Sequence, residues 1–181
     1  MIDVDMDEVG KVEYENYKIL FLGFQNSGKS TVHNIIFNDA RDKYKKNEYT
    51  LDINLADRIE IWDLPGAEWL RRHWKSLYFD TNGIIWIIDL SKDDHVIMFK
   101  WMKKAASHED LKNTIWLVLL HKRDTCTQEK VDLIRNEVPK ALPGKVHKLY
   151  VTSLTRRKRI KKAYNWLITE IVKADMKSAK K

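Results

Sequence analysis

Short apolar segments alternate along the chain with longer segments of helical periodicity. Continuous apolar runs and period-two alternation predict strands over 17–22, 58–62, 83–89, 114–120 and 146–151. Apolar residues spaced three and four apart predict helices over 29–37, 94–107, 128–142 and around 160–171. Because strands that alternate with helices pair in parallel through right-handed crossovers, we expect a three-layer α/β fold with helices on both faces of the sheet. Ligands of such sheets bind beyond the carboxyl ends of the strands.

The length and composition fit one globular domain. The chain has 181 residues, of which 44% are hydrophobic and 33% are charged. Its longest apolar runs fall well short of the roughly 20 residues of a membrane span. Four acids lie within the first eight residues, which is unlike a signal peptide. Cys126 is the single cysteine, which excludes an internal disulfide framework and favours a reducing compartment.

The charge is distributed unevenly. The net charge of +7 is compatible with an anionic partner. Residues 1–16 contain six acids and one lysine, whereas residues 156–181 contain ten bases and two acids. We expect an acidic N-terminal extension over 1–16 and a basic tail over 175–181, with the domain over 17–174 between them, the bounds that the resemblance described below also has. The bases near 156–162 favour a solvated helix face, with anionic lipid or an acidic partner as alternatives. No motif for reading nucleic acid accompanies them, so we expect no nucleic-acid partner.

The strongest motif follows the first predicted strand. Residues 23–30 read GFQNSGKS, which matches the phosphate-loop pattern G-x-x-x-x-G-K-[ST] at every fixed position. Gly28 would let the backbone approach phosphate oxygens, Lys29 would reach the β- and γ-phosphates, and the Ser30 hydroxyl would ligate Mg²⁺. The nucleotide-binding residues predicted in this loop are Gln25, Asn26, Ser27, Gly28, Lys29, Ser30 and Thr31.

A second motif ends the strand predicted over 58–62. It reads DLPG, from Asp63 to Gly66. A carboxylate at a strand tip can hold a Mg²⁺-bound water, and the Gly66 N–H can meet a γ-phosphate oxygen. A motif this short is weak evidence by itself, and its position directly after a predicted strand makes the interpretation more specific.

Two further motifs at predicted strand ends would read the base. Asp124, in the segment HKRD, would accept hydrogen bonds from N1 and the 2-amino group of guanine, a donor pattern that adenine lacks. The stem of Lys122 would cover the face of the base. The pair Thr152-Ser153 ends the last strand, and Ser153 would offer a backbone N–H to the guanine carbonyl. Together the motifs predict guanine nucleotide rather than adenine nucleotide.

These motifs, in this order, resemble those of the Ras-superfamily small GTPases and, among them, of the Arf/Sar group. The resemblance rests on GFQNSGKST at 23–31, WDLPGAEWLRRHW at 62–74, GIIWIID at 83–89, HKRD at 121–124 and TSLTRRKRIKKAYNWL at 152–167. It extends over residues 17–174. It implies one phosphate-loop GTPase domain with a mostly parallel six-stranded sheet, GTP or GDP with Mg²⁺, and two switch segments that read the γ-phosphate.

The resemblance also implies roles for individual residues and partners. The family carries a Mg²⁺-ligating threonine ahead of the DLPG segment, and Thr50 is the only threonine between Val32 and Asp63. The implied metal ligands are Ser30, Thr50 and, through water, Asp63, with Lys29 and Gly66 as the implied catalytic residues. An exchange factor, an activating protein and an effector are the implied partners. The implied setting is vesicle traffic or membrane organisation, in the cytoplasm and peripheral to an endomembrane.

Two positions depart from the family pattern. Ala67 stands directly after Gly66, where the family has the Gln or His that orients the attacking water, and this predicts slow GTP hydrolysis. His121 stands where the family has the Asn of N-K-x-D, which ties the base to the phosphate loop. A neutral His can donate one hydrogen bond, so the resemblance implies His121 as a nucleotide-binding residue. These departures keep open an alternative, a degenerate GTPase that holds GTP as a scaffold. A nucleotide kinase is a second alternative, disfavoured by HKRD at a strand end and by the lack of an Arg-rich lid insertion.

Two tryptophans beside the DLPG segment favour different roles. Trp74 lies on an apolar helical pattern with Leu70 and Leu77, which predicts core packing. Trp69 lies outside this pattern, and tryptophan is enriched at interface hot spots. We therefore expect the Trp69–Trp74 region to contact an effector, with Trp69 as the anchor.

Overall fold

The computed structural model describes residues 16–36 and 59–178, and the backbone alone at 42–46 and 49–54. The strands are β1 (Tyr17–Gly23), β2 (Asp42–Lys46), β3 (Tyr49–Asn54), β4 (Ile59–Asp63), β5 (Gly83–Asp89), β6 (Ile115–His121) and β7 (His147–Val151). The helices are α1 (Lys29–Ile36), α2 (Glu68–Arg71), α3 (His95–Ala106), α4 (Gln128–Ala141) and α5 (Arg157–Ser178). The acidic extension predicted over 1–16 lies, apart from residue 16, outside the described residues.

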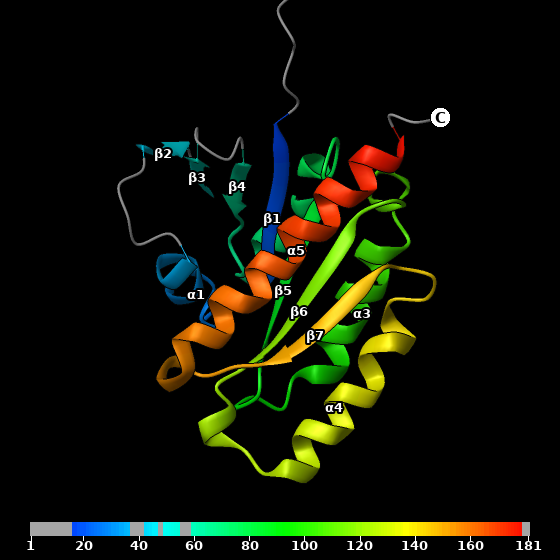
Figure 1. The fold of residues 1–181 in the computed structure, drawn as a ribbon. Coiled ribbons are helices and arrows are strands. Elements are labelled where there is room, and N and C mark those ends of the chain that lie inside the picture. The colour runs from blue at the N-terminus through cyan, green and yellow to red at the C-terminus, as the bar shows by residue number, and fades with distance from the viewer. Residues whose placement is uncertain (1–15, 37–41, 47–48, 55–58, 179–181) are drawn as a thin grey trace, which may run out of the picture.

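The strands form one sheet in the order β2-β3-β4-β1-β5-β6-β7 (Figure 1). Five neighbouring strands pair in parallel, in the order β4, β1, β5, β6 and β7. β3 runs antiparallel to β4, and β2 runs antiparallel to β3. β5 and β6 are buried at every position, so both of their faces are covered, which explains why they read as continuous apolar runs. The predicted fold class, a mostly parallel three-layer α/β domain, is confirmed.

In the described residues the sheet has seven strands and not the six that the family resemblance implied. Sequence periodicity predicted neither β2 nor β3. The sequence of β2 is DKYKK, four charged residues around one tyrosine, which carries no apolar pattern. That of β3 is YTLDIN, in which Tyr49, Leu51 and Ile53 alternate with polar residues. β2 lies at the edge of the sheet, where sequence patterns are weakest because an edge strand buries less apolar surface. β3 lies between β2 and β4, and its short alternation was the available signal.

Two apolar layers cover the two faces of the sheet. Figure 1 shows α5 crossing in front of the strands and α3 behind them. On the first face, α1 and α5 contribute the buried residues Val32, Ile35, Ile160, Ala163, Leu167 and Ile171. On the second face, α3 and α4 contribute Met98, Met102, Val131, Ile134 and Val138. Because α1 and α5 lie on one face and α3 and α4 on the other, the carboxyl edge of the sheet stays free for a ligand.

The helix boundaries agree closely with the sequence pattern. Helix α4 begins after Thr127, whose hydroxyl accepts a hydrogen bond from the backbone N–H of Lys130 (3.4 Å), as an N-cap residue does. Helix α5 continues to Ser178, beyond the domain boundary predicted at 174. Its Asp175 carboxylate accepts a hydrogen bond from the Tyr17 hydroxyl at 2.9 Å, which fastens the end of α5 to the start of β1. Within the described residues, every helix is too short or too polar to span a membrane.

A cluster of tryptophans fills the second face. The rings of Trp86 on β5 and Trp116 on β6 stack with their centroids 6.0 Å apart, and Trp74 meets Trp86 edge to face at 5.8 Å. The Trp86 indole N–H points to the Met98 sulfur at 3.2 Å. Trp74 is 1% exposed, which confirms the prediction that it packs in the core. The segment after Gly66 is therefore attached to the core through one aromatic side chain.

We predict that Trp86→Ala lowers the free energy of unfolding by about 3–5 kcal/mol, because the substitution leaves a cavity beneath Trp74 and Trp116. Trp69→Ala is the matched control, since Trp69 is 64% exposed and surface substitutions change stability by about 0.5 kcal/mol or less. Chemical denaturation followed by far-ultraviolet circular dichroism measures both. Equal losses in the two variants would contradict the assignment of Trp86 to the core.

Candidate functional site

Four segments that the sequence singled out meet at the carboxyl edge of the sheet. The phosphate loop follows β1, the DLPG segment follows β4, HKRD follows β6 and Thr152-Ser153 follows β7. The strands β1, β4, β5, β6 and β7 are parallel, so their carboxyl ends lie at one edge of the sheet. Backbone hydrogen bonds join the segments to one another, as between the Arg123 N–H and the Thr152 carbonyl (3.1 Å). This edge is the candidate site.

The phosphate loop packs tightly against its neighbours. Gly28 has a backbone φ of +95°, a conformation that residues other than glycine rarely adopt. A Cβ at Gly28 would also lie 2.8 Å from Cδ2 of His121. Helix α1 begins at the next residue, and the Val32 N–H closes its first turn by donating to the Gly28 carbonyl at 2.9 Å. The loop therefore leads directly into a helix N-terminus, the arrangement that binds phosphate.

Lys29 lies inside the loop. Its ammonium donates to the backbone carbonyls of Gly23 (3.0 Å) and Phe24 (3.1 Å), and the residue is 8% exposed. Burial lowers the pKa of Lys29, while the nearby Asp63 carboxylate acts in the opposite direction. The loop carbonyls thus hold the cation at the end of β1, as expected for a phosphate-binding lysine.

Ser30 and Asp63 meet as a pair of oxygen donors. The Ser30 hydroxyl donates to Oδ2 of Asp63 at 3.1 Å. Mg²⁺ prefers oxygen ligands and keeps several waters, so a hydroxyl beside a carboxylate fits this ion. The backbone of Thr50 on β3 pairs in register with that of Asp63 on β4, which brings the third predicted ligand residue to the same strand end. The donor set therefore suits the predicted metal.

Gly66 lies against the phosphate loop. Its carbonyl accepts hydrogen bonds from the Gln25 N–H (3.1 Å) and from Nε of Arg71 (3.0 Å). A Cβ at Gly66 would lie 2.6 Å from the Gln25 nitrogen, so no larger residue fits without a shift of backbone. The position predicted to sense a γ-phosphate is thus in contact with the loop that would hold it.

Ala67, the residue after Gly66, is 8% exposed and precedes the first turn of α2. Its methyl group neither donates nor accepts a hydrogen bond. Glu68, the next residue, is exposed.

Lys122 joins the HKRD segment to the phosphate loop. Its ammonium donates to the Asn26 carbonyl at 2.9 Å and to Oδ2 of Asp89 at 2.6 Å. Burial tends to raise the pKa of Asp89, but hydrogen bonds from Lys122 and Ser91 outweigh it and hold that pKa below its usual value. The connection to the loop that the family makes through Asn is therefore made here by the neighbouring lysine.

His121 is buried beneath the loop. It is 1% exposed, and its Nδ1 lies 3.1 Å from the Thr152 hydroxyl. Burial and the positive charge of Lys122 lower the pKa of His121, so the ring is neutral at physiological pH. Its other edge packs on Gly28. His121 thus supports the loop by packing, a contact that the residue type alone did not reveal.

The two residues predicted to read the base, Asp124 and Ser153, lie close together at one end of the site. Asp124 lies in a short helical turn, Arg123–Thr125, and is exposed. Ser153 is 4% exposed, and its hydroxyl is hydrogen-bonded to that of Thr155 at 2.7 Å. Both residues line the same cavity, so the structure brings them together at one end of the site.

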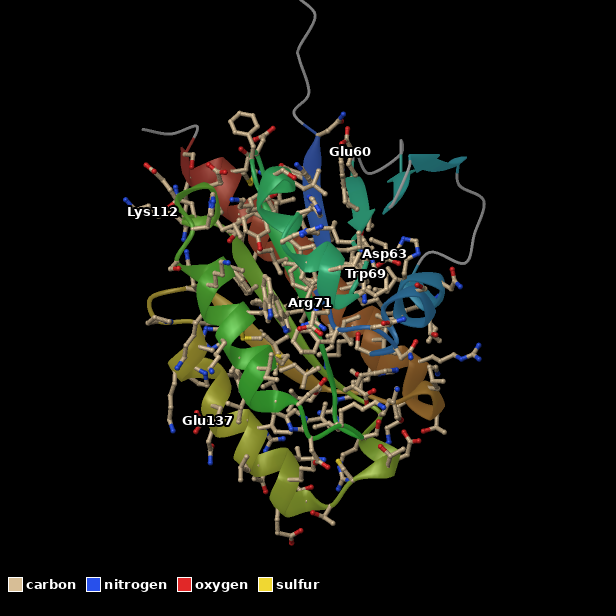
Figure 2. The ribbon with its side chains drawn as sticks, turned by 180° about the vertical axis from the view of Figure 1, so that it is seen from behind. Glu60, Asp63, Trp69, Arg71, Lys112 and Glu137 are labelled. Atoms are coloured by element: carbon tan, nitrogen blue, oxygen red, sulfur yellow. The ribbon has the colours of Figure 1, made fainter. Side chains whose placement is uncertain are left out.

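Two residues of the site escaped sequence reasoning. Asp89 is the last residue of β5, and its place after a buried strand was the available signal. No sequence pattern indicated a role for Arg71. Its guanidinium carbon lies 3.6 Å from the Phe24 ring centroid, and the residue is 8% exposed. Burial lowers the pKa of Arg71. Figure 2 shows Arg71 closer to the middle of the molecule than Trp69.

Comparisons with known proteins agree with this geometry. The model of the ADP-ribosylation factor family matches residues 5–171. ADP-ribosylation factor-like protein 5 of Caenorhabditis elegans is 32% identical over 117 residues, which are 61% of this chain and 64% of that protein. ADP-ribosylation factor-like protein alp41 of Schizosaccharomyces pombe is 27% identical over 169 residues, 89% of each chain. The alignment to the first of these relatives thus spans somewhat less than two thirds of its length.

Solved structures share the fold. The Arl6 BBS3 small GTPase of Trypanosoma brucei, with a bound nucleotide analogue, superposes with a TM-score of 0.73 at 16% identity, over 88% of this chain and 99% of that one. The small COPII coat GTPase SAR1 of Encephalitozoon cuniculi, in complex with GDP, gives a TM-score of 0.64 at 20% identity, over 91% and 84% of the two chains. With a family model that matches nearly the whole chain, a GTPase fold and a phosphate loop at its carboxyl edge, this protein belongs to the ADP-ribosylation factor family.

Proposed function

We propose that this protein is a guanine-nucleotide switch that binds GTP and GDP with Mg²⁺ and hydrolyses GTP slowly. The observation that carries the proposal is the contact of three segments at one sheet edge. The Gln25 N–H to Gly66 carbonyl bond joins the phosphate loop to DLPG, and the Lys122 bond to the Asn26 carbonyl joins it to HKRD. Residues for phosphate, metal and base thus form one connected site.

Phosphate binding would rest on the loop. The backbone N–H groups of residues 25–31 and the start of α1 would surround the β-phosphate. Lys29 would exchange its carbonyl partners for phosphate oxygens. Gly66 would donate its N–H to the γ-phosphate. Because Gly66 already contacts Gln25, the loss of that phosphate would directly affect the conformation of the segment that leads to α2.

Metal binding would use Ser30 and Thr50 directly and Asp63 through a water. Bound Mg²⁺ would neutralise charge on the β- and γ-phosphates. Thr50 and Asp63 are paired on neighbouring antiparallel strands, so a ligand that engages both would fix β3 against β4. These strands together with residues 63–78 would form the two switch segments.

Base recognition would use Asp124, Lys122 and Ser153. The carboxylate of Asp124 would accept two hydrogen bonds from guanine, and the Ser153 N–H would donate to its carbonyl. The Lys122 stem would lie over the ring, its ammonium anchored by Asp89 at 2.6 Å. The buried His121 would hold the phosphate loop from below.

Hydrolysis would be slow because Ala67 cannot orient a water. A partner protein would then have to supply the missing group, and groups supplied in this way are worth about 10³–10⁵ in rate. The second candidate, a GTP-holding scaffold without significant hydrolysis, is favoured by the same Ala67 and by His121.

Partners would bind near the second switch segment. Trp69 is 64% exposed, so it is suited to anchor an effector, while Trp74 is buried and is not available to one. An exchange factor and an activating protein complete the proposed cycle. We place it in vesicle traffic or membrane organisation, in the cytoplasm and at the surface of an endomembrane.

The first test identifies the nucleotide. The purified protein should retain GTP or GDP, bind GTP in preference to ATP, and convert bound GTP to GDP. Asp124→Asn should lower GTP affinity by about tenfold or more, because two charge-assisted hydrogen bonds are lost, and should favour xanthosine triphosphate, whose C2 carbonyl accepts from an amide. Asp110→Asn, an exposed carboxylate at the opposite end of the sheet, is the control. A preference for ATP would remove both candidates, and GTP retained unhydrolysed for hours would favour the scaffold.

We further predict that Ala67→Gln accelerates single-turnover GTP hydrolysis by about ten- to a hundredfold, since it restores a side chain that can orient water. Ala67→Leu has similar bulk without the amide and should not accelerate it. Hydrolysis of the unaltered protein as fast as that of an activated Arf-type protein would show that Ala67 is no obstacle.

Nucleotide release should depend on pH through His121. Its folded-state pKa lies below the ordinary value of about 6.5, so the neutral ring stabilises the site above that pH and the stabilisation is lost as the pH falls through the lowered pKa. Release of a fluorescent GDP analogue should therefore accelerate as the pH drops below about 6.5. His121→Asn should remove this acceleration, and an identical pH profile in both proteins would refute the assignment.

A further inference from the structure

A cavity of about 420 Å³ lies between α4 and the start of α5, beside the end of β7. Figure 1 shows the first turns of α4 and α5 at the same end of the molecule. The residues that line the cavity include Asp124 and Ser153, so it adjoins the base-reading end of the site. No residue of the phosphate loop lines it, nor does Lys122. Most of the cavity is thus unused by the proposed nucleotide cycle.

Four arginines line this cavity, from four different elements. Arg123 precedes α4, Arg135 lies within α4, Arg156 ends the short turn before α5, and Arg159 lies in the first turn of α5. Asp124 is the only acid among the lining residues. Such convergence of guanidinium groups is costly unless anions compensate their repulsion, which makes the cavity a candidate for an anionic ligand.

The arginines divide into two that are held and two that are free to engage a ligand. Arg123 donates to the Cys126 carbonyl (2.6 Å) and to Oε1 of Gln128 (3.1 Å). Arg135 pairs with Asp132 at 2.9 Å. Arg156 and Arg159 are exposed, and neither side chain has a hydrogen bond or ion pair with the part of the chain that the structure describes. Two guanidinium groups with protein partners, those of Arg123 and Arg135, and two without partners among the described residues, those of Arg156 and Arg159, therefore line the same cavity.

The rest of the lining indicates the chemistry of the ligand. Gln128, Thr152 and Thr155 add polar groups, and only Val131 and Val151 are aliphatic, so an apolar ligand would find little surface to bury. Guanidinium groups bind phosphate through two parallel hydrogen bonds. The volume lies within the roughly 300–1,000 Å³ of small-molecule sites. We propose that this cavity is a second binding site, for an anion that carries several phosphate groups.

The proposed ligand could be supplied as a soluble polyphosphorylated molecule or as the headgroup of a phosphorylated lipid. The bases that continue along α5, among them Lys161 and Lys162, would attract either one without forming the cavity. These two lysines give a matched control, because they carry the same charge on the same helix and do not line the cavity.

The test measures binding of inositol hexakisphosphate to protein loaded with GDP and Mg²⁺, by calorimetry. The variant Arg156→Gln/Arg159→Gln should weaken binding by about tenfold or more, since charge-assisted hydrogen bonds are removed. Lys161→Gln/Lys162→Gln should weaken it by less than about threefold, because only long-range attraction is lost. Equal weakening in the two variants, or no binding by the unaltered protein, would overturn the proposal.

Two further arms complete the experiment. Lys29→Ala, which would impair the phosphate loop, is compared with the unaltered protein when both are free of nucleotide and circular dichroism shows both folded. It should keep inositol hexakisphosphate binding, so failure of the proposed nucleotide function leaves this result readable. Loss of binding in Lys29→Ala would place the anion in the phosphate loop and overturn the second site. Phosphatidylcholine vesicles with and without phosphatidylinositol bisphosphate identify the source. Arginine-dependent binding to the phosphoinositide vesicles supports a lipid headgroup, and arginine-dependent binding of the soluble probe alone supports a soluble ligand.

Discussion

The contact between Gly66 and the phosphate loop is the constraint on which the rest of the site depends. The Gly66 carbonyl accepts from the Gln25 N–H and from Arg71, and there is no space for a Cβ. Arg71 packs in turn on Phe24, and Trp74 donates its indole N–H to the Pro65 carbonyl at 2.9 Å. A phosphate bound between the loop and Gly66 would therefore act on a segment anchored to the tryptophan core. In the proposed switch, rigidity on one side of this segment would direct a small change at the other side to the surface at Trp69.

Most of the fold could be predicted because burial leaves a strong pattern. β5 and β6 are apolar at nearly every position, and α3, α4 and α5 each present one apolar stripe to the sheet. β2 could not be predicted, since an edge strand is held by backbone hydrogen bonds that any sequence can make. β3 lies between β2 and β4, and the alternation of Tyr49, Leu51 and Ile53 was a signal, although a short one. The six strands implied by the family resemblance are one fewer than the seven in the described residues.

The site could be predicted where one residue type performs one chemical task. Gly28, Lys29, Ser30 and Asp63 were predicted in this way, and they lie in the loop after β1 and at the adjacent end of β4, where Ser30 contacts Asp63. Contacts between residues far apart in sequence left no such trace, as with Lys122 and Asp89, or His121 and Thr152. His121 shows the difference clearly. Its place in the motif suggested a residue that ties the base to the phosphate loop, and the structure adds its burial and its packing against Gly28, which the motif did not indicate.

The distribution of cations separates two kinds of phosphate recognition in one chain. In the phosphate loop a single buried lysine, held by two backbone carbonyls, would act with backbone N–H groups. At the cavity between α4 and α5 the recognition elements are side chains, four guanidinium groups with few fixed partners. The first arrangement discriminates by shape, since backbone amides cannot adapt. The second discriminates by charge and tolerates varied geometry. The positive excess of the chain therefore bears on the second ligand far more than on the nucleotide.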